Sequence, residues 1–277
     1  MTESIKYSLC ATTYNVESRL RKSLDSILRF INPIDFEIVV VDSESKDGTT
    51  DILKEYQNIF PNIKIIEKKC KRGLGRQISF ENSIGEYIVQ IDLDTLYSQQ
   101  WIEFIKAYEK WEGHKKYAVQ ACFSGIYPRH LLEKVGGWRN LQWAEDIDLW
   151  WRLIKINSFK WCPLIVGENW EVEEPERRQS KNILIIVWRK FINEKDRFIV
   201  RSEYSIRNRL KEVKSFSTQK TYWFFWIPIV IFAKISSLFY RREKRDAKKV
   251  NEIWMKNMID FDIEGTINYN FIKFPER

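Results

Sequence analysis

Cysteine is scarce in this chain of 277 residues, and the four cysteines lie far apart, at Cys10, Cys70, Cys122 and Cys162. None forms a C-x-x-C pair, so the spacing disfavours a zinc site and a disulfide framework. We expect free, mostly buried thiols in a reducing compartment. The residues before Tyr7 are polar and carry no apolar run, so no signal peptide is expected. There is no internal repeat and no low-complexity tract, which excludes a repeat architecture.

Charge is distributed unevenly along the chain. The net charge is +8, and 44% of the residues are hydrophobic, which is enough for one substantial core or one core with an appendage. Residues 1–175 hold 23 basic and 26 acidic side chains, a net charge of −3, whereas residues 176–277 hold 23 and 12, a net charge of +11. A basic C-terminal third suggests an anionic partner, either a membrane surface or nucleic acid, although a solvated helix face gives the same composition.

The first half of the chain alternates short apolar runs with amphipathic segments. Strands are predicted at residues 7–12, 36–41, 63–66, 87–91 and 117–123, and helices at 16–28, 51–60, 76–83, 101–111, 128–135 and 144–156. The run FEIVVV at 36–41 is typical of a strand that is buried on both faces. This alternation indicates an α/β fold with a mostly parallel sheet, in which ligands bind at the carboxyl ends of the strands.

The polar, acidic stretch GENWEVEEP at residues 167–175 is the predicted boundary between a catalytic domain, 1–175, and a basic helical region, 176–277. Residues 222–233 form a run of twelve apolar residues, and residues 222–240 make a marginal span of nineteen that contains Pro228 and Lys234. Together with the basic cluster at 241–249, they suggest a membrane interface, by peripheral or re-entrant insertion rather than a clean span. A helix buried against the catalytic domain is the alternative.

Carboxylates follow several of these elements. Asp92 and Asp94 come directly after a predicted strand, and carboxylates two residues apart can converge on one hard divalent cation. Asp42 ends the FEIVVV strand, where it can accept hydrogen bonds from a base or a ribose. Glu145 and Asp146 open a helix, where acidic residues are usually dipole partners; beside a metal site, one of them becomes a candidate general base.

Five segments stand out along the chain: TTYN at 12–15, VVVDSESKDGT at 39–49, GLGRQISFENSIGEYIVQIDLD at 73–94, VGGW at 135–138 and WAEDIDLWWRL at 143–153. Together they resemble the family 2 glycosyltransferases of the GT-A fold, which is a Rossmann-like α/β fold. Each motif is weak alone, but all five occur in order over residues 7–153. The resemblance implies a hexosyltransferase that moves one sugar from a UDP- or GDP-sugar to a hydroxyl or lipid-phosphate acceptor, with inversion and with Mn²⁺ or Mg²⁺.

The resemblance also assigns roles to individual residues. Asp146 is the expected catalytic base, supported by Glu145, and Asp94 the expected metal ligand, shared with Asp92. The expected contacts with the nucleotide-sugar are Thr13, Tyr14, Asp42, Arg76 and Asp92, with Arg76 near the diphosphate. Trp138 and Trp143 flank the Glu145–Asp146 pair and are candidates for acceptor contact.

Some features depart from the family or leave alternatives open. The segment 219–223 (QKTYW) lacks the arginine of the Q-x-x-R-W motif, which speaks against a processive synthase. No histidine follows His130, so a late histidine metal ligand is excluded. Arg177 and Arg178 are candidates for clamping the diphosphate.

The rival functions are a membrane-associated binding protein without turnover and a sugar nucleotidyltransferase. The latter would carry a Gly-rich basic loop after the first strand, where this chain has TTYN. We expect no nucleic-acid partner, since the basic third has no known motif for one. The expected location is the cytoplasmic face of a membrane, bound through residues 222–249.

Overall fold

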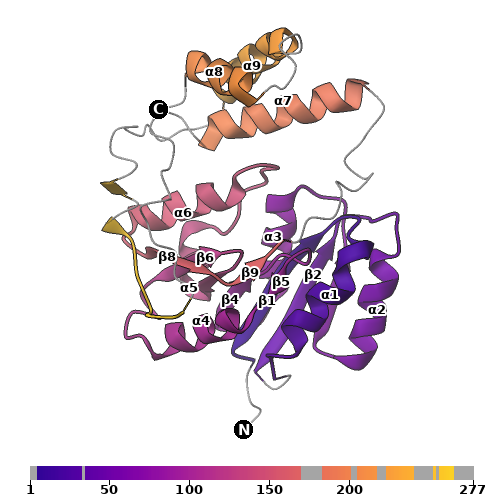
Figure 1. Ribbon diagram of the computed structural model, residues 1–277, viewed down its shortest axis with the longest axis vertical. Helices are drawn as coiled ribbons and strands as arrows, with labels where there is room; N and C mark the ends of the chain where they lie inside the picture. The colour runs from indigo at the N-terminus through magenta and orange to yellow at the C-terminus, as the bar shows by residue number, and fades with distance from the viewer. Residues whose placement is uncertain are drawn as a thin grey trace.

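A twisted seven-stranded sheet forms the centre of the protein in the computed structural model (Figure 1). The structure describes residues 5–32, 35–169, 183–200, 205–216, 223–239, 252–253 and 256–264. Within them the strand order is β3-β2-β1-β4-β7-β6-β8. The strands are β1 (Tyr7–Thr13), β2 (Phe36–Asp42), β3 (Ile63–Glu67), β4 (Tyr87–Gln90), β6 (Ala118–Cys122), β7 (Gly125–Pro128) and β8 (Phe159–Ile165). Strands β1 to β4 pair in parallel, β7 pairs antiparallel with β4 and β6, and β6 and β8 are parallel.

Helices cover both faces of the sheet, as the continuous apolar strands require. The helices of the sheet domain are α1 (Glu17–Leu28), α2 (Thr49–Ile59), α3 (Arg72–Glu81), α4 (Gln99–Lys110), α5 (Arg129–Val135) and α6 (Glu145–Lys155). Leu9 of β1 faces the core that α1, α2 and α4 cover, whereas its neighbour Cys10 faces the core of α3, α5 and α6. This alternation follows from the two-residue period of a strand and confirms the predicted α/β fold.

The first five predicted strands and the six helices before residue 156 are all present, with shifted ends. Helix α3 begins at Arg72 rather than at the predicted Arg76. Gly73 and Gly75 disfavour a helix in the sequence, but both lie in its first turn, where the absence of a side chain allows close packing. A Cβ on Gly73 would lie 2.1 Å from the Arg139 carbonyl oxygen. The prediction missed β7 and β8, which are a four-residue strand and a strand with Pro163 inside it. It also missed the small antiparallel pair β5 (Leu96–Tyr97) and β9 (Gly167–Glu168).

Three helices follow the sheet domain: α7 (Ile183–Val200), α8 (Ile206–Phe216) and α9 (Trp223–Ser237). Helix α7 lies between α8 and α9 on one side and the sheet domain on the other (Figure 1). Residues 256–264 return to the sheet domain, where the Ile259 N–H donates to the carbonyl of Trp161 in β8. The predicted boundary at 167–175 falls largely outside the described residues, as does the basic cluster at 241–249.

Helix α9 has one covered face and one exposed face. Val230, Ala233 and Ser237 are fully buried, and the first two pack against Phe198 of α7. Phe232, at 65% exposed, and Ile235, at 48%, lie on the other side. Among the described residues, no helix has both the length and the apolar character needed to cross a bilayer. The predicted alternative was a buried helix or hairpin packed on the catalytic domain, whereas the buried residues of α9 pack on α7.

Candidate active site

A cavity of about 770 Å³ opens at the carboxyl edge of the parallel strands. Its floor comes from the ends of β1 and of β4, and its far wall comes from α7. Four of the site residues predicted from the sequence line the cavity: Thr13, Tyr14, Asp92 and Asp94. Four others do not line it: Asp42, Arg76, Glu145 and Asp146.

Asp42 supports the cavity from behind. Its carboxylate is fully buried and accepts hydrogen bonds from the Thr13 hydroxyl at 2.9 Å, the Ser45 hydroxyl at 2.6 Å and the Ser45 N–H at 2.8 Å. The parallel register of β1 and β2 pairs Thr13 with Asp42 directly. With no exposed surface, Asp42 does not meet a base in this conformation. It instead fixes Thr13, which lines the cavity.

Asp92 and Asp94 lie where β4 ends, and both line the cavity. The backbone N–H of Asp92 donates to the Tyr97 hydroxyl at 2.8 Å, which fixes the turn after the strand. Burial raises the pKa of Asp92 above its ordinary value, with the negative charge of Asp94 adding to the effect and Arg76 opposing it. The described residues contain no cluster of three or more His, Cys, Asp or Glu side chains able to hold a metal. The two carboxylates alone fit an ion that is shared with phosphates and water, which is how Mg²⁺ is usually bound.

Arg76 joins the carboxylates of the site to one another. Its guanidinium is 4% exposed and contacts Asp146, Glu145 at 2.9 Å and Asp92 at 3.1 Å. Burial opposes the charge of Arg76, but the three carboxylates raise its pKa overall. Arg76 does not line the cavity, and its donors contact carboxylates, one of which, Asp92, does line it; the expectation that Arg76 lies near the diphosphate stays a prediction. The sequence placed it on the correct helix but gave no information about its burial.

Glu145 and Asp146 begin α6 but differ in exposure. Glu145 is 1% exposed, and burial, with the charge of Asp146 beside it, raises its pKa to about 7, against the opposing effect of Arg76. The Asp146 side chain is 23% exposed and accepts a hydrogen bond from the Trp138 indole N–H at 3.3 Å. Asp146 is therefore the one of the two that a second substrate can reach, whereas Glu145 is placed to support it.

The two tryptophans expected at the acceptor have other contacts. Trp138 is 3% exposed, packed edge-on against Phe80 and Tyr127, so it offers no surface for sugar stacking. The Trp138 indole N–H instead donates to Asp146, and acceptor contact by either tryptophan stays a prediction. The ring of Trp143 lies 4.1 Å from the guanidinium carbon of Arg197, so α7 covers one of its faces.

Helix α7 supplies a wall of the cavity that was not predicted. Trp188, Arg189, Ile192 and Asn193 line the cavity, and their spacing puts them on one face of the helix. Asp196, on the next turn, accepts the backbone N–H of Gln142 at 2.7 Å and is 1% exposed. The sequence showed only a basic helix, and a basic amphipathic helix gives the same pattern whether it faces a lipid or a protein surface.

The strand order, with nucleotide-sized space at the carboxyl edge and an Asp-x-Asp turn beneath it, defines a glycosyltransferase of the GT-A fold. The chain belongs to glycosyl transferase family 2, whose sequence profile matches residues 8–165. Family members transfer sugars from nucleotide-sugar donors to acceptors.

Similar proteins extend the comparison. The glycosyltransferase GlyA of Streptococcus pneumoniae is 35% identical over 186 residues, which are 59% of this chain and 26% of that protein. A poly(ribitol-phosphate) β-glucosyltransferase of Bacillus spizizenii is 31% identical over 110 residues, 37% of this chain and 17% of that one. The chain thus spans about a quarter or less of the length of these two curated relatives.

Two solved structures share the fold. The mannosyltransferase PcManGT of Pyrobaculum calidifontis, in complex with GDP-Man and Mn²⁺, gives a TM-score of 0.56 at 16% identity, covering 86% of this chain and 88% of its own. Residues 1–349 of S. aureus TarS, in complex with UDP, give a TM-score of 0.54 at 16% identity, covering 82% and 71%. At such identities the likeness concerns the fold alone.

Proposed function

We propose that this glycosyltransferase moves a single sugar from a UDP- or GDP-sugar to a hydroxyl or lipid-phosphate acceptor, with inversion and with the help of a divalent ion. The observation that carries the proposal is the linked set of carboxylates at the carboxyl edge of the sheet. Asp92 and Asp94 line the cavity, and Arg76 connects Asp92 to the partly exposed Asp146. The buried Arg76 guanidinium thus joins Asp92, a proposed metal ligand, to Asp146, the proposed base.

The donor is proposed to lie in the cavity, with its base near Thr13 and Tyr14 and its diphosphate near Asp94. Tyr14 is 45% exposed and lines the cavity, so its ring is available to a base. Asp94 and Asp92 would hold Mn²⁺ or Mg²⁺, which would offset the negative charge of the departing diphosphate.

Asp146 is the proposed general base. The acceptor oxygen forms a bond to the anomeric carbon while the bond from that carbon to the phosphate oxygen breaks. The hydroxyl proton passes to Asp146, and the bonding electrons leave with the nucleoside diphosphate. One displacement inverts the anomeric centre. The buried Glu145 and the Trp138 indole hold Asp146 in place.

Transfer and donor hydrolysis by the purified chain, measured over a panel of UDP- and GDP-sugars with and without Mn²⁺, test this proposal. We expect turnover that depends on the metal, and Asp146→Asn should remove it while nucleotide binding persists. Asp51→Asn, which changes an exposed carboxylate on α2, is the matched control. Tight nucleotide binding without turnover would favour the alternative, a binding protein that has lost catalysis. Release of diphosphate from a nucleoside triphosphate and a sugar phosphate would indicate a nucleotidyltransferase.

We also propose that the C-terminal helices bring the site to the cytoplasmic face of a membrane, which suits a lipid-linked acceptor. The exposed apolar residues Phe232 and Ile235 of α9 recur at helical spacing, and Leu238 and Phe239, just past the end of the helix, are also exposed. Residues 241–249 (RREKRDAKK) follow directly in the sequence and bring a cluster of positive charge. An apolar helix face next to basic residues suits an anionic bilayer surface.

A further inference from the structure

The cavity needs positive charge that the predicted site does not supply. Asp92 and Asp94 together carry two negative charges. One divalent ion balances these two charges and leaves no net positive charge for the phosphates. A nucleoside diphosphate leaves with about three further negative charges that need partners. Arg76 is not among the residues that line the cavity, and its contacts already go to the carboxylates of Asp92, Glu145 and Asp146.

Four basic side chains among the described residues do line the cavity. Lys69, Lys71 and Arg72 come from the loop and first turn at the start of α3, and Arg189 comes from α7. The Nε atom of Arg72 lies 3.8 Å from Glu145, so its charge is partly shared with that carboxylate. Arg189 is the one cation that reaches the cavity from the wall facing the sheet, and it makes no ion pair with another residue in the described part of the chain.

Helix α7 holds Arg189 in a defined place, since the helix is fixed on both sides. Toward the sheet domain, Asp196 accepts the Gln142 N–H and Arg197 covers the Trp143 ring. Toward α8, the buried Glu194 takes two hydrogen bonds from Arg209, at 2.6 and 2.7 Å. Arg189 lies within about two turns of these anchors. A guanidinium on an anchored helix loses little freedom when it binds an anion, and its planar fork suits phosphate oxygens.

We propose that Arg189 binds the diphosphate of the nucleotide-sugar and stabilises it as it departs, which makes α7 a catalytic wall of the site. The inference rests on the proposed function, and it assigns a role to a helix outside the residues 8–165 that match the family. Arg189 takes the place of Arg76 in this role, and it faces the diphosphate from the side opposite Asp92 and Asp94.

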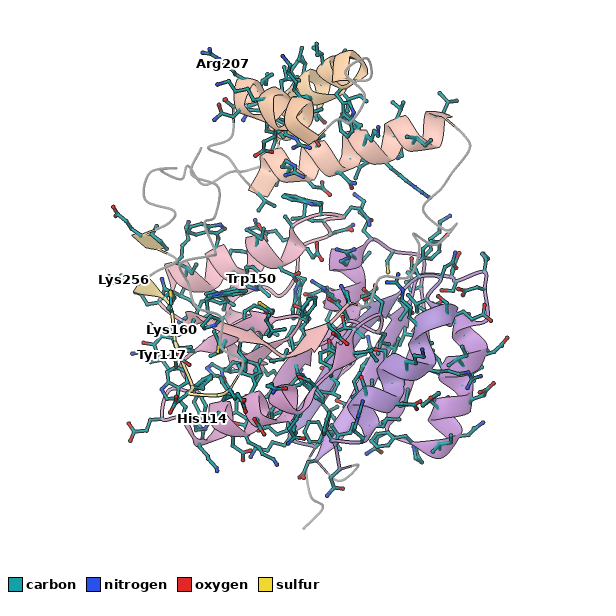
Figure 2. The ribbon with its side chains drawn as sticks, in the orientation of Figure 1. His114, Tyr117, Trp150, Lys160, Arg207 and Lys256 are labelled. Carbon is teal, nitrogen blue, oxygen red and sulfur yellow. The ribbon has the colours of Figure 1, made fainter. Side chains whose placement is uncertain are left out.

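Nucleotide titration by calorimetry tests the proposal without relying on turnover. Wild type, Arg189→Ala and Arg189→Lys would be titrated with UDP, UMP, GDP and GMP, with and without Mn²⁺. Arg207→Ala is the matched control, because Arg207 is also exposed and extends from α8 away from α7 and the sheet domain (Figure 2). Thermal unfolding of each variant checks that the fold is kept.

We expect Arg189→Ala to bind the diphosphate about 10- to 100-fold more weakly, the usual effect of losing a charge-assisted hydrogen bond. Binding of the monophosphate should change much less, Arg189→Lys should recover part of the loss, and Arg207→Ala should match wild type. Unchanged diphosphate binding in Arg189→Ala would overturn the inference, as would equal losses for diphosphate and monophosphate. If wild type bound none of the four nucleotides, the proposed function itself would fail.

Discussion

Replacing Arg76 with methionine removes the positive charge that three carboxylates share, while keeping most of the apolar volume of the side chain. The loss leaves Glu145, which is 1% exposed, beside the partly exposed Asp92 and Asp146 with no buried cation. Removing one partner of a buried ion pair costs about 3–5 kcal/mol. We therefore expect Arg76→Met to lower the free energy of unfolding by about that amount at pH 8.

The loss of stability caused by Arg76→Met should depend on pH, because Glu145 loses its proton within the range of the assay. Its pKa is raised from 4.5 to about 7 in the folded protein, so the folded state binds more protons than the unfolded state between these values. The free energy of unfolding therefore falls as pH rises through this window. Arg76 opposes the shift, so removing it raises the pKa of Glu145 further and extends the fall above pH 7. At pH 5.5, where Glu145 is protonated, the cost of Arg76→Met should be smaller by about 1–2 kcal/mol.

Urea denaturation followed by tryptophan fluorescence at pH 5.5, 7 and 8 measures both effects. Arg21→Met is the matched control, because Arg21 pairs with Glu55 on the surface, where both side chains are about half exposed. We expect little change in that variant at any of the three pH values. An Arg76→Met protein as stable as Arg21→Met at pH 8, or one whose deficit does not shrink at pH 5.5, would refute the reasoning.

Two further predictions concern the C-terminal helices and the start of α3. Phe232→Glu combined with Leu238→Glu should lower binding to anionic vesicles at least tenfold in a co-sedimentation assay. Ile59→Glu, at an exposed apolar site on α2, should leave vesicle binding unchanged. Equal binding by wild type, the double variant and Ile59→Glu would contradict the membrane proposal. Gly73→Ala should lower the free energy of unfolding by about 1–3 kcal/mol in the same urea assay, because its Cβ would lie 2.1 Å from the Arg139 carbonyl oxygen; a variant as stable as wild type would contradict that close approach.

The sequence predicted best where local pattern and structure coincide. Strands β1, β2 and β4 are mostly apolar and buried on both faces, so their ends could be located, and with them Thr13, Asp42 and the Asp92–Asp94 turn. A parallel sheet brings such ends to one edge, which is why side chains from distant segments could be assigned to one site.

Other features depend on contacts that a single sequence does not reveal. Arg76 and an exposed arginine look alike along a helix, and only the arrival of α6 from seventy residues away buries it among carboxylates. Trp138 looked suited to sugar contact because its neighbours are catalytic, yet Tyr127 and Phe80 enclose it. The exposed fraction of a side chain is a tertiary property, so charge and aromaticity alone did not reveal that both residues are buried.

The C-terminal helices are joined to the chemistry of the site through one short loop. Gly73 donates its N–H to the Leu141 carbonyl, Gln142 donates to Asp196 of α7, and Trp143 lies against Arg197. These three consecutive loop residues, 141–143, directly precede Ala144, Glu145 and Asp146. The position of the proposed base is thus fixed from one side by α3 and from the other by α7. Because α7 in turn packs on α9, a surface that binds the exposed face of α9 acts on a helix that also forms the cavity wall. The proposed membrane binding and the geometry of the proposed catalytic carboxylates would therefore be physically linked through α7.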